Sequence, residues 1–163
     1  LTSRLGVAFV KGLQGDGEYL KLAACAKHYA VHSGPESLRH EFDAVSNPKD
    51  MWETYLPAFE AAVKEAKVEA VMGAYNRTNG EPCCGSKTLM KDILRGEWGF
   101  KGLVTTDWWT HGLHYKEIAA GNDVKMARGN PEHTLQMIRE GKLDETCVRT
   151  SCRRVLEMIL RLD

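Results

Sequence analysis

Three short segments carry the side chains best suited to chemistry. Lys27-His28 places a cation beside an imidazole, Tyr75-Asn76 a phenol beside an amide, and Asp107-Trp108-Trp109 a carboxylate beside two indoles. Donors and acceptors of these kinds bind hydroxyl groups, while aromatic rings stack on the apolar face of a ligand. This composition suits a sugar, and no glycine-rich phosphate loop accompanies it.

Each of these residues also has a structural alternative. Asp107 could cap a following helix, because aspartate is a favoured N-cap residue. Lys27 could be a solvated or ion-paired strand end. Trp108 and Trp109 could belong to the core, and we expect one of them to do so.

A metal site and a glycosylation site are weaker interpretations. His28 and His32 stand four residues apart, a metal-binding spacing on a helix, but Gly34-Pro35 interrupts any helix there. Asn76-Arg77-Thr78 matches a glycosylation acceptor, although such triplets are common by chance. We therefore expect neither a metal nor a cofactor.

Alternating apolar and amphipathic segments must position these residues. Four short apolar runs predict strands: Leu22–Ala26, Ala70–Ala74, Leu103–Thr106 and the shorter Asp123–Met126. Helices are expected over residues 3–14, 49–66, 87–97, 110–119, 131–140 and 144–162. In the first helix, Leu5, Phe9, Val10 and Leu13 should share one face, and Pro57 should kink or divide the second. The alternation predicts an α/β fold with a parallel sheet, whose carboxyl-terminal strand edge gathers the candidate site residues.

Four such units make half of an eightfold barrel, which normally needs about 250 residues. The fold class is therefore α/β, and we expect either a small open sheet or a partial (β/α)8 barrel, roughly its last four βα units. The chain opens at Leu1 without an initiator methionine. We expect residues 1–163 to be one fragment of a longer protein.

Composition narrows the classes of partner. The 22 basic and 22 acidic residues give a formal net charge of zero, so no basic surface is available for nucleic acid or anionic lipid. No apolar run is long enough to span a membrane. Five cysteines form an odd set without C-x-x-C spacing, which favours reduced thiols and a cytoplasmic location.

Six ordered motifs resemble those of glycoside hydrolase family three and cover nearly the whole chain. They are Ala26-Lys-His-Tyr-Ala30, Pro35-Glu-Ser-Leu-Arg39, Glu53-Thr-Tyr-Leu-Pro-Ala-Phe59, Val71-Met-Gly-Ala-Tyr-Asn76, Glu97-Trp-Gly-Phe100 and Val104-Thr-Thr-Asp-Trp108. The resemblance implies a barrel-like domain followed by a second α/β domain, which this chain does not contain. It also implies hydrolysis of terminal β-D-glucosyl or xylosyl residues with retention of configuration.

The resemblance implies a role for seven residues. Asp107 would be the nucleophile, and the substrate-binding residues would be Lys27, His28 and Arg39 on sugar hydroxyls, Tyr75 beside the nucleophile, and Met72 and Trp108 in the glucose subsite. Neighbouring cations would keep the carboxylate of Asp107 ionised. The segment 27–32 lacks the His-Gly-x-Asp pattern of the family's N-acetylglucosaminidases, which favours a glucosidase or xylosidase.

The resemblance also implies what the chain lacks. Retaining hydrolysis needs a second carboxyl group, which the family usually takes from its second domain, and Glu36, Glu97 and Glu117 match no motif for it. We expect the chain alone to be inactive and to self-associate through exposed sheet edges. Its partners would be a β-glucoside or oligosaccharide, the missing barrel half and the second domain.

Two alternatives remain open. One is a non-catalytic, sugar-binding half-barrel. The other is a different α/β-barrel enzyme acting on a phosphorylated substrate, with only Gly121-Asn-Asp123 and Arg128-Gly129 in its favour.

Overall fold

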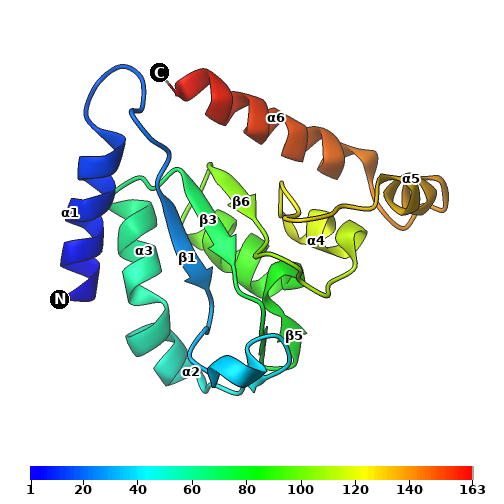
Figure 1. Cartoon of the computed structure of the whole chain (residues 1–163), viewed down its shortest axis with the longest axis horizontal. Coiled ribbons are helices and arrows are strands. Elements are labelled where there is room, and N and C mark those ends of the chain that lie inside the picture. Colours follow the sequence, from blue (N-terminus) through cyan, green and yellow to red (C-terminus); the bar gives the residue numbers. More distant parts are fainter. Residues whose placement is uncertain (163) are drawn as a thin grey trace.

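The computed structural model describes residues 1–162. At its centre three parallel strands lie side by side in the order β1 (Cys25–Tyr29), β3 (Ala70–Gly73) and β6 (Leu103–Thr105), as Figure 1 shows. A further parallel bridge joins Thr105 to Val124 beyond β6. A second, smaller sheet contains β2 (Asp43–Ala44), β4 (Arg77–Thr78) and β5 (Glu81–Pro82).

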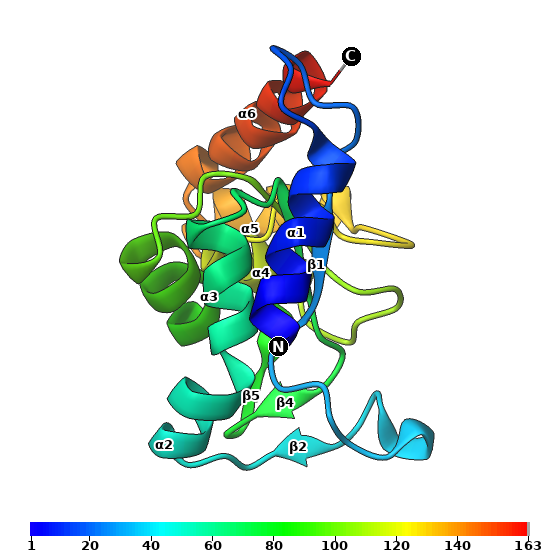
Figure 2. The ribbon, with the colours of Figure 1, turned by 90° about the vertical axis from the view of Figure 1, so that its left-hand side faces the viewer.

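Helices precede, connect and follow the parallel strands. They are α1 (Thr2–Gln14), α2 (Pro48–Asp50), α3 (Pro57–Lys64), α4 (His114–Ala120), α5 (Pro131–Arg139) and α6 (Glu145–Arg161). Shorter or wider helical segments are η1 (Glu36–Leu38), η2 (Met51–Tyr55), η3 (Cys83–Gly85) and η4 (Thr88–Glu97). Figure 2 shows α1, α3 and η4 on one side of β1, with the loops that follow β6 on the other side.

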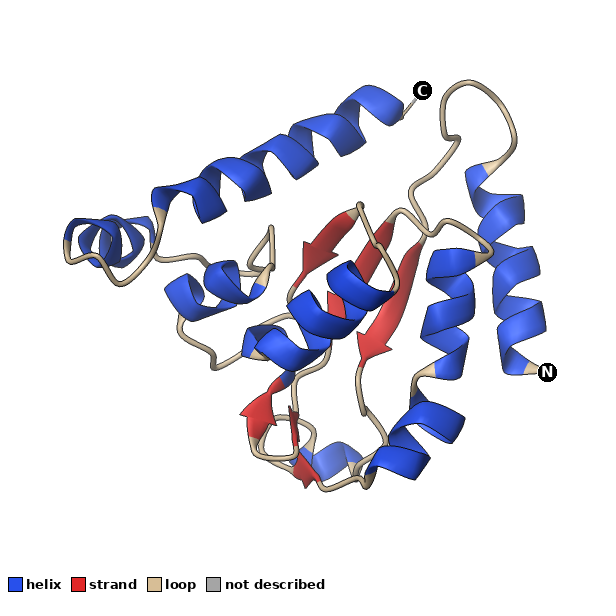
Figure 3. Ribbon diagram, turned by 180° about the vertical axis from the view of Figure 1, so that it is seen from behind, coloured by secondary structure: helices blue, strands red, loops and turns tan. Residues whose placement is uncertain are grey.

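The sheet is held by its apolar centre. Val71 of β3 and Val104 of β6 are fully buried, and the β-branched side chains of both favour extended backbone. Gly102 allows the chain to enter β6 next to β3, because a Cβ atom there would lie 2.1 Å from the carbonyl oxygen of Glu69. This packing fixes the central sheet, whose strands are red in Figure 3, and Asp107 follows two residues after β6 ends.

Most of the predicted elements are confirmed. The helix expected over residues 49–66 is divided at Pro57 into α2, η2 and α3. The helices expected over 3–14, 87–97, 131–140 and 144–162 are present as α1, η4, α5 and α6. The helix expected from residue 110 begins later, at His114, so residues 107–113 form a longer loop than predicted.

Three details of the prediction are wrong. The first strand is Cys25–Tyr29 and not Leu22–Ala26, so Lys27 and His28 lie within the strand and not beyond its end. Leu5 and Phe9 of α1 are 62% and 69% exposed, because α1 turns Val7, Val10 and Leu13 toward the core. The fourth strand is reduced to the single bridge at Val124.

The described residues therefore form a mixed α/β fold with an open three-stranded parallel sheet. The partial (β/α)8 barrel stays a prediction. Among residues 1–162, no helix combines the length and the apolar character needed to span a lipid bilayer.

Candidate functional site

Asp107 lies two residues beyond β6 and is buried, with 8% of its surface exposed. One carboxylate oxygen, Oδ1, accepts a hydrogen bond of 2.7 Å from the backbone N–H of Trp108. The structural alternative for Asp107 is wrong, because the next helix, α4, has Leu113 and not Asp107 as its N-cap. Asp107 is thus a buried carboxylate at the carboxyl end of a strand without a helix to cap.

His28 faces this carboxylate from β1. Its Nε2 atom lies 3.2 Å from Oδ2 of Asp107. The contact has ion-pair distance but not the alignment of a hydrogen bond, and Oδ2 has no hydrogen-bond partner among the described residues. Burial lowers the pKa of His28, while the negative charge of Asp107 acts in the opposite direction. The neutral ring is therefore favoured beside a buried oxygen that accepts no hydrogen bond from the described residues.

A break in the pairing of β1 explains how His28 reaches Asp107. The register between β1 and β3 shifts between Ala26 and Tyr29, and such irregularities redirect side chains. Ala26 and Tyr29 both pack against the hydrophobic core, whereas Lys27 is exposed. The strand pattern of the sequence gave no signal for this irregularity.

Tyr75 and Arg39 complete the surroundings of Asp107. The guanidinium carbon of Arg39 lies 5.7 Å from the centre of the Tyr75 ring. Burial raises the pKa of the Tyr75 hydroxyl, and the nearby carboxylate of Asp107 raises it further. The structure therefore brings together four of the predicted site residues: Asp107, His28, Tyr75 and Arg39.

The other three predicted residues border this group. Lys27 lines a cavity of about 270 Å³ together with His28 and His32. Met72 is half-buried on β3 and pairs with Thr105 of β6. Trp108 is 47% exposed and Trp109 60% exposed, with their rings edge to face. The expectation that one of the two indoles belongs to the core is wrong, because the loop turns both outward.

The weaker interpretations find little support. The rings of His28 and His32 lie 4.7 Å apart, yet within residues 1–162 no group of three potential metal ligands forms. Asn76 is fully buried and donates a hydrogen bond of 2.8 Å to the carbonyl of Val31. Its amide is therefore inaccessible for glycosylation in the folded chain. The five cysteines carry no disulfide.

Two of the other carboxylates are already engaged. Glu36 forms a surface ion pair with Arg39. Glu117 is 1% exposed, and its two carboxylate oxygens contact Lys125 and Thr110. Burial raises the pKa of Glu117, and Lys125 opposes that effect. Both carboxylates are thus already paired within the described residues.

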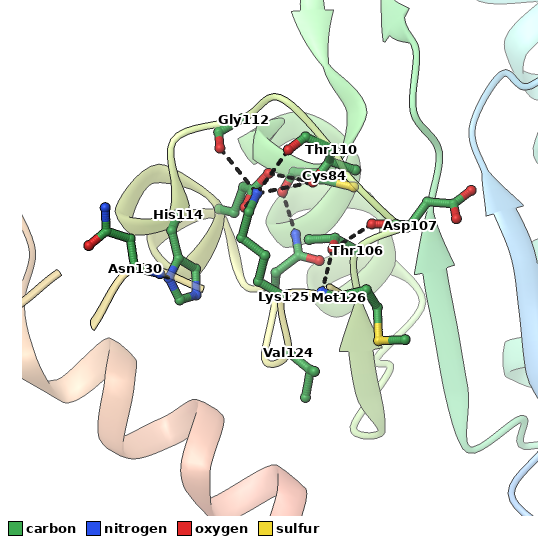
Figure 4. A network of polar contacts seen from close by, with 12 residues as sticks. Cys84, Thr106, Asp107, Thr110, Gly112, His114, Val124, Lys125, Met126 and Asn130 are labelled. Carbon is green, nitrogen blue, oxygen red and sulfur yellow. Dashed lines mark hydrogen bonds and ion pairs between the residues drawn. The ribbon is translucent and has the colours of Figure 1, made fainter. Parts of the chain in front are cut away.

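Sequence reasoning missed several neighbours of the site. The rings of His40 and Tyr75 lie 4.1 Å apart, and His111 stacks edge-on against His40 at 5.9 Å. Figure 4 shows a polar network that reaches from Asp107 to Lys125. Most of its labelled members lie outside the helices and strands, where periodicity carries no information, although Cys84 belongs to η3 and His114 to α4.

A larger hollow of about 350 Å³ lies between η2, η4 and the small sheet. Several polar groups there pair with each other. The hydroxyl of Ser86 donates a hydrogen bond to Glu81, and the side-chain amide of Asn79 both accepts from the N–H of Ser46 and donates to its carbonyl. The hollow is lined by neither Asp107 nor any other predicted site residue.

Comparisons with known proteins agree on one family. The profile described as "Glycosyl hydrolase family 3 N terminal domain" matches residues 1–158. The chain is 46% identical to a xylan 1,4-beta-xylosidase of Xylanibacter ruminicola over 96% of its own length and 20% of that protein. It is 36% identical to a beta-glucosidase of Bacteroides ovatus, over 99% of the chain and 23% of that protein.

Solved structures give the same result. Beta-glucosidase 3B of Thermotoga neapolitana, in complex with alpha-D-glucose, superimposes with a TM-score of 0.90 at 31% identity, over 98% of this chain and 23% of that one. An exo-beta-xylosidase in complex with a xylobiose aziridine probe gives a TM-score of 0.88 at 27% identity, over 98% of this chain and 23% of that one. The chain spans about a fifth to a quarter of the length of these relatives. It belongs to glycosyl hydrolase family 3.

Proposed function

We propose that the chain supplies the nucleophile of a retaining β-glycosidase that removes terminal β-D-glucosyl or xylosyl residues. One observation carries the proposal: Asp107 is buried at the end of β6, with Oδ1 fixed by a backbone N–H and Oδ2 free of hydrogen bonds among residues 1–162. A fixed carboxylate with one unoccupied oxygen is preorganised for attack on a sugar.

The reaction has two displacements. In the first, Oδ2 of Asp107 bonds to the anomeric carbon while the bond to the leaving oxygen breaks and an acid protonates that oxygen. In the second, a water deprotonated by the same acid/base group attacks the anomeric carbon and releases Asp107. Glu117 is paired with Lys125 and Glu36 with Arg39. As the family resemblance implies, we propose that the acid/base role belongs to a carboxyl group outside this chain.

The neighbours of Asp107 would bind the sugar. We propose that Lys27, His28 and Arg39 hold hydroxyl groups, while the exposed indole of Trp108 stacks on the ring. Met72 would line the glucose subsite and Tyr75 would lie beside the nucleophile. The proposed reaction involves neither a metal nor a cofactor.

Residues 1–163 would form roughly the last four βα units of a barrel domain within a longer protein. The parallel order of β1, β3 and β6 and the short share of each relative that the chain covers support this. The remaining barrel half and a second α/β domain would complete the site, and the chain alone would be inactive.

The test is replacement of Asp107 by Asn in the full-length protein. We expect kcat/KM for an aryl β-glucoside or β-xyloside to fall by at least about 10³-fold, because the amide cannot form the glycosyl ester. Asp16→Asn, at an exposed loop position, is the control and should keep full activity. Full turnover by the Asp107 variant would overturn the proposal. A wild-type protein that binds glucosides without hydrolysing them would favour the sugar-binding alternative.

A further inference from the structure

The loop 107–113 carries Asp107 and both exposed indoles but has no regular structure of its own. Trp109 adopts a left-handed backbone conformation, with φ of 64°, which non-glycine residues hold only when their surroundings fix it. Something outside the loop must therefore set its shape.

Lys125 supplies this contact from outside the loop. Its Nζ atom donates to three groups of the loop, at 3.1 Å to Oγ1 of Thr110, 3.3 Å to the carbonyl of Thr110 and 3.1 Å to the carbonyl of Gly112. It also lies 2.6 Å from Oε2 of Glu117. The side chains of Lys125 and Glu117 are 10% and 1% exposed, so the charges neutralise each other within the protein and are little screened by water.

Glu117 contacts the same part of the loop. Its Oε1 atom accepts a hydrogen bond of 3.2 Å from the hydroxyl of Thr110. Gly112 passes so close that a Cβ atom there would lie 2.3 Å from Oε1. Lys125 and Glu117 thus both contact the far end of the loop, and Figure 4 shows Lys125 beside Thr110 and Gly112.

The position of Lys125 is tied in turn to β6. The preceding residue, Val124, bridges Thr105 and accepts a hydrogen bond of 3.0 Å from the N–H of Thr106. The following residue, Met126, donates its N–H to Oγ1 of Thr106 at 2.9 Å. Residues 124–126 therefore hold both the residue before Asp107 and the far end of the same loop.

We propose that Lys125, paired with Glu117, is a positioning residue that sets the loop bearing Asp107, Trp108 and Trp109. This inference rests on the proposed role of Asp107 as nucleophile. Lys125 does not touch the reacting atoms. It fixes the distance between the carboxylate and the indole surface against which the sugar would lie, and small displacements of such groups reduce rates strongly.

The experiment compares Lys125→Met with Arg154→Met in the full-length protein. Arg154 of α6 forms an ion pair with Asp123, and its polar contacts among the described residues include none to the loop 107–113. Its loss therefore tests the removal of a part-buried cation that does not contact this loop. At a temperature well below both melting transitions, we expect Lys125→Met to lower kcat/KM about 10- to 100-fold. Both a fall in kcat and a rise in KM should contribute to this loss. The kcat/KM of Arg154→Met should stay within about threefold of the wild-type value.

Thr110→Val provides a milder test if Lys125→Met does not fold. It removes only the hydroxyl that contacts both Lys125 and Glu117, and we expect a smaller loss in the same direction. Unchanged kinetics in a folded Lys125→Met protein, or equal losses in Lys125→Met and Arg154→Met, would overturn the inference. If the inference fails in this way while Asp107→Asn abolishes activity in the same series, the proposed role of Asp107 as the nucleophile still holds.

Discussion

The environment of His28 links the candidate chemistry to pH at the scale of single residues. Burial lowers the pKa of His28 from its ordinary value of 6.5, and the charge of Asp107 only partly offsets this. The folded protein therefore favours the neutral ring more than the unfolded chain does. Folding stability contributed by this residue is present above pH 6.5 and is lost as the pH falls through the depressed pKa.

This predicts a smaller acid sensitivity for His28→Asn. Between pH 7.5 and pH 5, the melting temperature of the wild type should fall more than that of the variant, because the variant has no ring to protonate at this position. His133→Asn, outside the site, corrects for general effects of losing a histidine. Identical pH dependence of wild type and His28→Asn, by calorimetry at the two pH values, would contradict the assignment.

The site was only partly predictable at this scale. The strand before Asp107 is a buried apolar run. The position of Asp107 at the end of that strand could therefore be predicted directly from the sequence. The contact between His28 and Asp107 could not, because it depends on a register shift in β1 and on residues 79 positions apart in the chain. The enclosure of Gly112 by Glu117 depends likewise on loop geometry that no periodic pattern encodes.

At the scale of elements, Asp123 joins three parts of the fold. Its side chain is fully buried and forms ion pairs of 2.8 Å with Arg95 of η4 and 2.9 Å with Arg154 of α6. It also accepts a hydrogen bond of 2.8 Å from the N–H of Val104 in β6. Burial lowers the pKa of Arg95 to about 10, although Asp123 opposes the effect. One carboxylate thus holds two helices on the strand that leads to Asp107.

Replacing Asp123 by Asn should therefore be costly. The variant leaves a buried guanidinium without its counter-charge, and breaking such a pair costs about 3–5 kcal/mol. Glu145→Gln provides a matched control on the surface, where Glu145 pairs with Arg149 at 56% and 74% exposure, and should change the free energy of unfolding by less than about 1 kcal/mol. Urea titration of both variants measures the difference, and equal values would refute the central role of Asp123.

The error in the buried face of α1 has a physical cause. Helical periodicity placed Leu5, Phe9 and Val10 on one apolar face, but only Val10 is buried, and Leu5 and Phe9 are exposed. Periodicity identifies an apolar stripe without saying which part of it the available neighbours cover. The elements themselves were predictable, whereas the choice of covered surface depends on the rest of the protein.

At the scale of the whole molecule, apolar surface remains uncovered. Leu5 and Phe9 of α1 are 62% and 69% exposed, and Leu156 and Leu160 of α6 are 59% and 74% exposed. A hollow of about 580 Å³ between α5 and α6 is lined mainly by apolar side chains, including Leu156. Contiguous apolar surface of this kind marks an interface or a tendency to aggregate.

We therefore predict that the chain expressed alone self-associates. Sedimentation velocity should show dimers or larger species, and the double change Leu156→Lys with Leu160→Lys should shift the distribution toward monomer. Val45→Lys replaces a residue that is 86% exposed in a loop and should leave the distribution unchanged, because isolated apolar residues are normal on protein surfaces. A wild-type chain that sediments as a single monomer and melts cooperatively would contradict the prediction.

The central claim is that Asp107 bonds covalently to the sugar during the reaction. The most direct measurement is to treat the full-length protein with a β-configured glycosyl aziridine probe, digest it and locate the adduct by mass spectrometry. The account predicts one labelled peptide with the sugar on Asp107, and no labelling of that peptide in Asp107→Asn. An adduct on another carboxylate, with Asp107 unmodified in an enzyme that the probe has inactivated, would contradict it.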